Sequence, residues 1–203
     1  MYRRRDGGFL RIVWSVAFIM VGFFLLLYPQ IEKRISENKE QELIEAFEQI
    51  AYIEEPVINT STKETSKDRL DDVRGVIRIP KIDLEMPIID GATHTALNKG
   101  VGMIEPEKEF GINNIGLAGH RSATYGKQFN RLDELSPNDE IQVKTKKGSY
   151  TFVISKTFVV HRTEVEVIAD KHEPLVTLVT CTPIGEEDPI DRLIVQAKLK
   201  SKG

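Results

Sequence analysis

The sequence predicts a mostly β protein, a closed or nearly closed β-barrel with a few short helices, preceded by one transmembrane helix. Two observations predict the barrel. Seven or eight short runs of alternating or β-branched apolar residues follow Val73, and Gly, Pro, Asn and Asp separate these runs. An uncharged apolar run near the N-terminus predicts the membrane helix.

The apolar run extends from Ile12 to Tyr28 and is long enough to cross a bilayer as a helix. Arg3, Arg4 and Arg5 precede it, which predicts a cytoplasmic N-terminus and an extracellular chain after the run. The alternative is a cleaved signal peptide, but the residues after the run offer no small-residue cleavage site. We therefore expect residues 1–29 to form a cytoplasmic tail and a single membrane anchor.

A charged segment comes next and contains an apolar stripe at helical spacing. The stripe consists of Leu43, Ile44, Phe47, Ile50 and Ala51. It either docks on the folded domain or belongs to a stalk, and we favour the stalk. The polar, aperiodic run from Asn59 to Asp72 is typical of a flexible linker. Residues 30–72 are thus expected to be a helical stalk and linker.

The folded domain is expected over residues 73–203, with strands and turns in close succession. The predicted strands are two within Gly75–Ile89, divided by a turn near Pro80, then Asn114–Ala118, Glu140–Thr145, Ser149–Val160, Leu175–Val179 and a last strand opened by Arg192. Lys146-Lys147-Gly148 predicts a hairpin turn.

Two short helices are expected between these strands. Thr93 is a typical helix N-cap, and Gly100 ends the helix that it starts. The second predicted helix covers Gln128–Leu135, and Ser136-Pro137 stops it.

Cys181 is the only cysteine in the chain and lies at the end of a predicted strand. It cannot form an intramolecular disulfide, so it is either a buried small side chain or a reactive thiol. A reactive thiol needs a positive neighbour and a group that moves protons. His120, just after one predicted strand, and Arg192, at the start of another, are the candidates.

These motifs together resemble the sortases, the membrane-anchored cysteine transpeptidases of Gram-positive bacteria. Thr177-Leu178-Val179-Thr180-Cys181 matches a TLxTC strand, Ala118-Gly119-His120 matches an upstream AGH, and Arg192 leads the next strand. The resemblance covers roughly residues 75–199. It implies an eight-stranded barrel with the active site in a groove on one side.

The resemblance also implies the roles of the candidate residues. Cys181 would be the nucleophile, His120 the general acid/base and Arg192 the oxyanion or substrate clamp, with Thr180 as a substrate contact. The substrates would be surface proteins with an LPxTG-like C-terminal sorting signal, cut after the Thr. The acyl group would pass to an amine of the peptidoglycan precursor. The enzyme would need no cofactor and would act at the cell membrane, with its catalytic domain outside.

Calcium stimulation remains open. Calcium-responsive sortases carry acids in the loop before the AGH strand, and Glu105 falls where the first of these would lie. Lys108 and Ile112 take the later positions, so Glu105 is a weak calcium candidate and a solvated acidic loop is favoured.

The remaining histidines are weaker candidates for catalysis. His161 follows an apolar strand and is an alternative to His120. His94 and His172 are expected to be surface residues, and Asp188 and Asp191 are possible partners of Arg192.

The stretch from Gly119 to Leu132 resembles class D sortases of Bacillus-like organisms. Pilin-polymerising sortases usually carry an Asp-Pro-aromatic lid and often a C-terminal span. Glu55-Pro56-Val57 does not match such a lid, and no span follows Leu199. We therefore favour a class D-like anchoring enzyme.

Two other classes stay open, a cysteine peptidase that hydrolyses similar peptides and a non-enzymatic membrane-tethered binding module with an inert Cys181. Nucleic acid is not an expected partner. Residues 1–30 carry four arginines against one aspartate, while the remainder carries 24 basic and 30 acidic residues.

Overall fold

The computed structural model describes residues 14, 20, 41–42, 44–47, 72–122, 128–171, 173–186 and 188–203. The predicted anchor lies outside these residues except for Trp14 and Met20, and so do the 59–71 part of the linker and the Glu55-Pro56-Val57 tripeptide. Within the described part of the chain, no helix has both the length and the apolar character needed to cross a bilayer.

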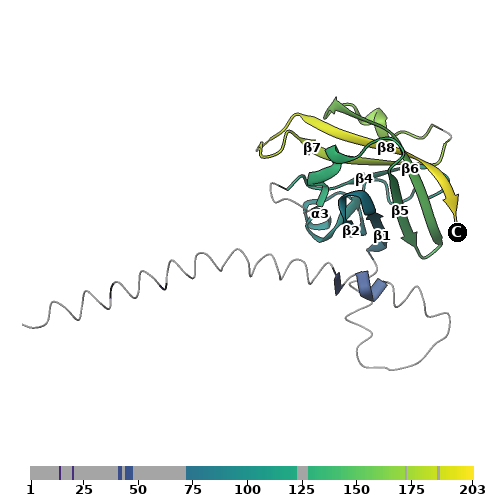
Figure 1. Cartoon of the computed structure of the whole chain (residues 1–203), viewed down its shortest axis with the longest axis horizontal. Coiled ribbons are helices and arrows are strands. Elements are labelled where there is room, and N and C mark those ends of the chain that lie inside the picture. Colours follow the sequence, from purple (N-terminus) through teal and green to yellow (C-terminus); the bar gives the residue numbers. More distant parts are fainter. Residues whose placement is uncertain are drawn as a thin grey trace, which may run out of the picture. The chain divides into compact units, whose positions relative to one another are not determined.

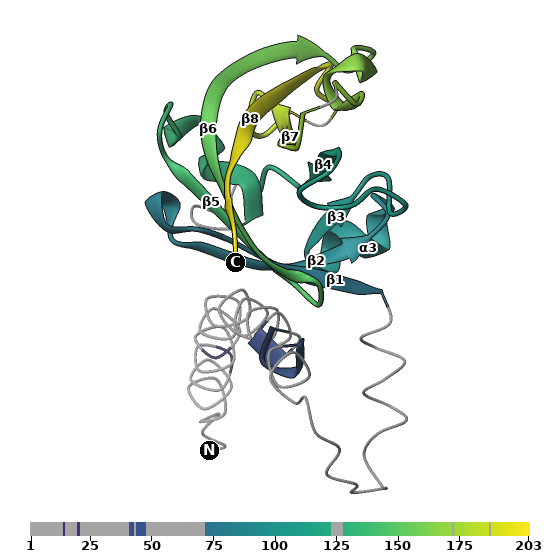
Figure 2. The ribbon, with the colours of Figure 1, turned by 90° about the vertical axis from the view of Figure 1, so that its right-hand side faces the viewer.

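Eight strands form a closed barrel in the order β1-β2-β3-β4-β7-β8-β6-β5, with β5 paired back to β1 (Figures 1 and 2). The strands are β1 Val73–Ile79, β2 Leu84–Asp90, β3 Val101–Met103, β4 Asn114–Ala118, β5 Glu140–Thr145, β6 Gly148–His161, β7 Leu175–Thr182 and β8 Asp191–Lys202. The predicted eight-stranded barrel is confirmed. Two neighbouring pairs are parallel, β2 with β3 and β4 with β7.

The helices are short, as expected. They are η1 Pro80–Ile82, α3 His94–Lys99, η2 Gln128–Glu134 and η3 Val165–Ile168. The Thr93 hydroxyl accepts a hydrogen bond from the Ala96 N–H at 3.2 Å, which confirms the predicted N-cap of α3. The second predicted helix is present but has 3₁₀ geometry.

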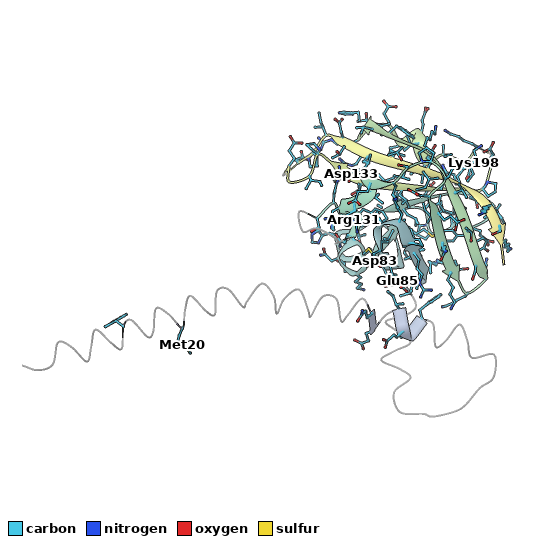
Figure 3. The ribbon with its side chains drawn as sticks, viewed as in Figure 1. Met20, Asp83, Glu85, Arg131, Asp133 and Lys198 are labelled. Carbon is cyan, nitrogen blue, oxygen red and sulfur yellow. The ribbon has the colours of Figure 1, made fainter. Side chains whose placement is uncertain are left out.

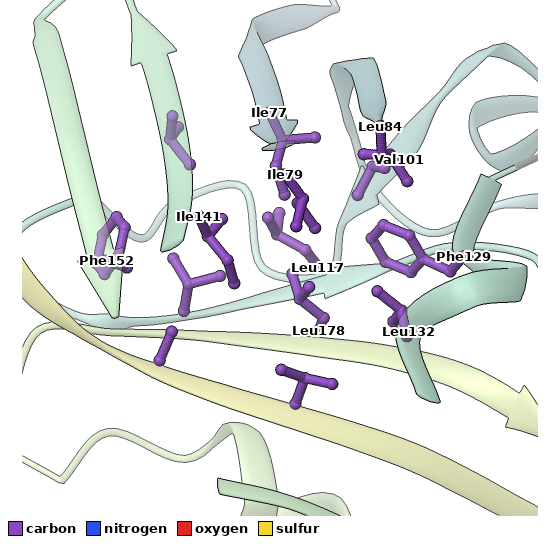
Figure 4. Packing of buried hydrophobic residues seen from close by; sticks show 14 of the residues in the cluster. Ile77, Ile79, Leu84, Val101, Leu117, Phe129, Leu132, Ile141, Phe152 and Leu178 are labelled. Carbon is purple, nitrogen blue, oxygen red and sulfur yellow. The ribbon is translucent and has the colours of Figure 1, made fainter. Parts of the chain in front are cut away.

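A single large apolar cluster fills the barrel and takes residues from all eight strands (Figure 4). Leu178 of β7 and Leu117 of β4 are fully buried in it, as is Val195 of β8. Because side chains alternate along a strand, this inward set fixes which residues face out. Cys181 comes three residues after Leu178, and Arg192 comes three residues before Val195. Both side chains therefore face outward.

A second apolar cluster lies against the outside of β1, β2 and α3. It contains Ile44, Phe47, Val73, Val76, Ile89 and Ala96. The side chain of Phe47 is 1% exposed, so this part of the apolar stripe is docked rather than part of a free stalk. We favoured the stalk because an amphipathic pattern does not identify what covers its apolar side. The expected domain boundaries stay predictions.

Candidate active site

Cys181 and Arg192 are direct cross-strand neighbours. The antiparallel register of β7 and β8 pairs these two residues, and both side chains are half-buried. Residues paired in this way on one face of a sheet have Cβ atoms about 4.5–5.5 Å apart. The sequence-based expectation that antiparallel pairing brings the arginine within reach of the thiol is confirmed.

Backbone carbonyl groups hold the Arg192 guanidinium at the end of β8. Its Nη1 donates to the carbonyl oxygens of Pro189 at 2.7 Å and Asp191 at 2.9 Å. Asp188, a predicted partner of Arg192, instead pairs with Arg162 at 2.8 Å. The positive charge beside the thiol is therefore not neutralised by Asp188, and it is suited to stabilise a thiolate or an oxyanion.

The parallel pairing of β4 with β7 carries His120 to the same edge of the barrel as Cys181. The register matches Ala118 with Val179, and the Gly119 N–H donates to the Val179 carbonyl at 3.1 Å. His120 and Cys181 are each two residues beyond the matched pair. They therefore continue the same outward face at adjacent strand ends.

The environment of His120 favours its neutral form. Partial burial is the main cause that lowers the pKa of His120, and the positive charge of protonated His94 lowers it further. A neutral imidazole can accept the thiol proton and later deliver it to a leaving amine.

Thr180 holds the His120 segment from inside the barrel. Its side chain is 2% exposed, and its hydroxyl donates to the Gly119 carbonyl at 2.8 Å. Gly119 in turn faces Phe129, since a β-carbon there would lie 2.6 Å from the ring. This side chain points into the barrel and is already hydrogen-bonded, and its expected contact with substrate stays a prediction.

Arg121 joins three parts of the site and was not found from the sequence. Its Nη1 donates to the Thr182 hydroxyl at 2.7 Å, and its Nη2 lies 3.0 Å from Asp133 of η2, which is labelled in Figure 3. The side chain is 7% exposed. Arg121 directly follows His120 and Thr182 directly follows Cys181, so this hydrogen bond joins the two chain segments that carry the candidate residues. An arginine directly after the AGH motif was the only available signal.

His94 is exposed, as the sequence predicts, and its ring also lies against that of His120. The ring centroids are 5.9 Å apart, and the planes meet at 65° in an edge-on contact. His161, the alternative to His120, is exposed and contacts Thr163 at 2.8 Å. It lies on β6, which β8 separates from β7. His172 is outside the described residues.

An ammonium group lies where the expected calcium site would be. Lys108 Nζ is 2.6 Å from Glu105 and 3.8 Å from Asp170, and it donates to the Ile168 carbonyl at 3.0 Å. Nowhere in the described ranges do three or more His, Cys, Asp or Glu residues converge in a way that would hold a metal. Lys108 thus places a cation at the point where the two segments meet.

Comparisons with known proteins agree on one family. The family model described as "Sortase domain" matches residues 77–200. Sortase A of Bacillus anthracis is 25% identical over 197 residues, covering 91% of this chain and 92% of that protein. Sortase D of Bacillus subtilis is 32% identical over 125 residues, or 61% of each chain. The solved structure of a Clostridium perfringens sortase D5 transpeptidase is 29% identical with a TM-score of 0.63, and the match covers 81% of this chain and 99% of that one.

Proposed function

The chain belongs to the sortase family of cysteine transpeptidases, and we propose that Cys181, His120 and Arg192 are its catalytic residues. The observation that carries the proposal is the register of β7 with its two neighbours. β8 pairs Arg192 with Cys181, and β4 ends at the same edge of the barrel, just before His120. A nucleophile, a proton carrier and a fixed cation then lie together at one edge of the barrel.

The proposed first half-reaction forms a thioester. The Cys181 thiolate attacks the carbonyl carbon of the scissile peptide, forming a C–S bond and an oxyanion that Arg192 stabilises. When the tetrahedral adduct collapses, the C–N bond breaks and His120 gives its proton to the leaving amine. In the second half-reaction an incoming amine attacks the thioester, His120 takes the amine proton, and the C–S bond breaks.

The proposed substrates follow from family membership. The first is a surface protein with an LPxTG-like sorting signal, cleaved after the Thr, and the second is an amine of the peptidoglycan precursor. The likeness to sortase D of Bacillus subtilis and to the sortase D5 structure supports a class D-like anchoring enzyme rather than a pilin-polymerising one. We also propose a single-pass membrane protein with a cytoplasmic N-terminus, on the basis of the apolar run after the arginine cluster.

We further propose that catalysis needs no metal ion and that Lys108 supplies the positive charge that would otherwise come from calcium. Its contacts with Glu105, in the loop before β4, and with Ile168, at the end of η3, support this proposal, since they join the segments that precede β4 and β7.

The test uses the full chain in detergent micelles, an LPxTG-type peptide, and a diamine acceptor that is either present or absent. We expect an amine-dependent product with the wild type. Cys181→Ala and His120→Ala should abolish it, and Arg192→Ala should reduce it by at least about a hundredfold. His161→Ala is the matched control, because that histidine is exposed and lies on β6, which β8 separates from the Cys181 strand.

Other outcomes would point elsewhere. Cleavage at the same rate with and without the amine would identify a peptidase. Absence of cleavage and of thioester across a varied peptide panel, together with slow labelling of Cys181 by a thiol reagent, would favour the binding module.

A further inference from the structure

His94 stands on the side of His120 that faces away from the nucleophile. β4, which ends just before His120, has β7 on one side and β3 on the other. α3 immediately precedes β3 and begins at His94. The ring of His94, in edge-on contact at 5.9 Å, therefore lies against the imidazole of His120 on the side opposite the Cys181 strand.

The chain holds His94 in place. The side-chain amide nitrogen of Asn98, one turn further along α3, lies 3.1 Å from His94 Nδ1. With this amide donating, neutral His94 carries its proton on Nε2. The Gln128 side chain donates to the Leu97 carbonyl at 3.1 Å, and the next residue, Phe129, donates its N–H to the His120 carbonyl at 3.1 Å. One short segment thus ties α3 to the backbone of His120.

Charge adds a second effect to this contact. Two imidazolium ions at this separation repel each other, so protonation of either ring opposes protonation of the other. Among the described residues, the charged or titratable groups on the elements next to His120 include Cys181 from β7, Arg192 from β8, and Arg121, whose partner Asp133 lies on η2. The described residues of β3 are uncharged.

We infer that His94 is a positioning residue for transpeptidation, one that holds the ring of His120 toward the nucleophile and keeps that ring neutral at rest. This inference rests on the proposed function of His120. The effect acts through His120, since His94 itself lies on the far side from the thiol.

Two variants separate the contact from the charge. His94→Phe keeps an aromatic edge beside His120 and removes the charge, whereas His94→Gln removes both. The full chain in detergent micelles, with ¹³C-labelled histidine, gives the titration of each of the four histidines, and His120→Gln assigns the His120 signal. The kcat/KM of peptide–amine transfer is measured over the same pH range.

Both variants should raise the pKa of His120 and move the acid limb of the pH–rate profile to higher pH, because the repelling charge is gone. We expect His94→Gln also to lower kcat/KM at the pH optimum about tenfold, while His94→Phe retains most of it. His161→Phe is the matched control, and it should leave the His120 titration and the profile unchanged.

An unchanged His120 titration together with an unchanged acid limb in both variants would overturn the inference. The His120→Gln variant keeps this outcome distinct from failure of the proposed function. Full transfer activity in that variant would remove His120 from catalysis, whatever His94 does to its titration.

Discussion

Thr180 lies beside the nucleophile, yet its hydroxyl is directed toward the backbone of the His120 segment. Thr180→Val keeps the shape of the side chain and leaves the Gly119 carbonyl without this donor. We expect a loss of about 1–3 kcal/mol in the free energy of unfolding and a lower transfer rate. Thr180→Ser, which retains the hydroxyl, should stay close to the wild type. Urea unfolding and initial rates measure both effects, and a valine variant as stable and active as the wild type would refute this role.

The shifted pKa of His120 predicts a pH dependence of stability. Folding lowers the pKa of His120 from its ordinary 6.5, mainly through burial, so the unfolded chain binds this proton more readily. The resulting stabilisation is present above pH 6.5 and is lost as the pH falls through the folded pKa. Relative to His120→Gln, the wild type should therefore lose unfolding free energy between pH 7.5 and pH 5.5. Urea unfolding at the two pH values tests this, and a constant difference between the proteins would contradict it.

The proposed catalytic residues could be singled out from the sequence because the chemistry requires rare residue types at recognisable places. Cys181 is the only thiol, and strand patterns put His120 and Arg192 at strand ends. The contact of His94 with His120 could not be predicted, because it depends on the crossover between β2 and β3, which carries α3. The burial of Arg121 could not be predicted either, because the sequence around Arg121 does not show that η2 supplies its acidic partner.

Among the elements, the 105–108 loop depends on one ammonium group for its contact with the segment that precedes β7. Lys108→Gln keeps the length of the side chain but leaves Glu105 and Asp170 without its charge. We expect this variant to have a higher KM, because the loop that precedes β4 is less well held. Wild-type activity should be the same in EDTA and in millimolar Ca²⁺.

Lys108→Glu provides the matching test of the calcium proposal. Three carboxylates would then converge between the two loops, and such oxygen-rich sets favour Ca²⁺. The activity of this variant should be low in EDTA and recover with Ca²⁺. A wild type that loses activity in EDTA and regains it with calcium would refute the proposal.

The docked segment at residues 44–47 gives α3 its outer support. Phe47→Ala removes a fully buried ring from the cluster that includes Ala96 of α3. Truncating such a ring typically costs about 3–5 kcal/mol, although detachment of the segment would limit the loss. Backbone amides of α3 should then exchange faster with deuterium than in Glu45→Ala, which alters an exposed residue of the same helix. Equal protection in the two variants would show that the segment does not support α3.

Element length explains which parts of the fold could be predicted. β7 and the β5–β6 hairpin are long enough for alternation to show, and their predicted positions are confirmed. β3 has three residues and η3 has four, which is too short for any periodic pattern to appear. The parallel pairing of β3 with β2 therefore had no signal in the sequence.

At the scale of the whole molecule, one cluster shared by all eight strands predicts a single unfolding transition. Leu178→Ala deletes a fully buried side chain in the middle of β7 and should cost about 2–5 kcal/mol. The same midpoint should be found by circular dichroism and by thiol accessibility of Cys181. Separate midpoints would mean that the catalytic edge unfolds on its own. The closed barrel itself could be predicted by counting strands, but the strand order could not.

The pairing of β4 with β7 also determines when the enzyme becomes active during folding. Residues 119–174, including β5 and β6, separate these two strands along the chain, and Arg192 comes with β8, later still. Contacts between such distant segments form late, because a long loop must close before they are made. A nascent chain can therefore hold the thiol and the histidine without their being assembled. The transpeptidase becomes active only when its barrel has closed.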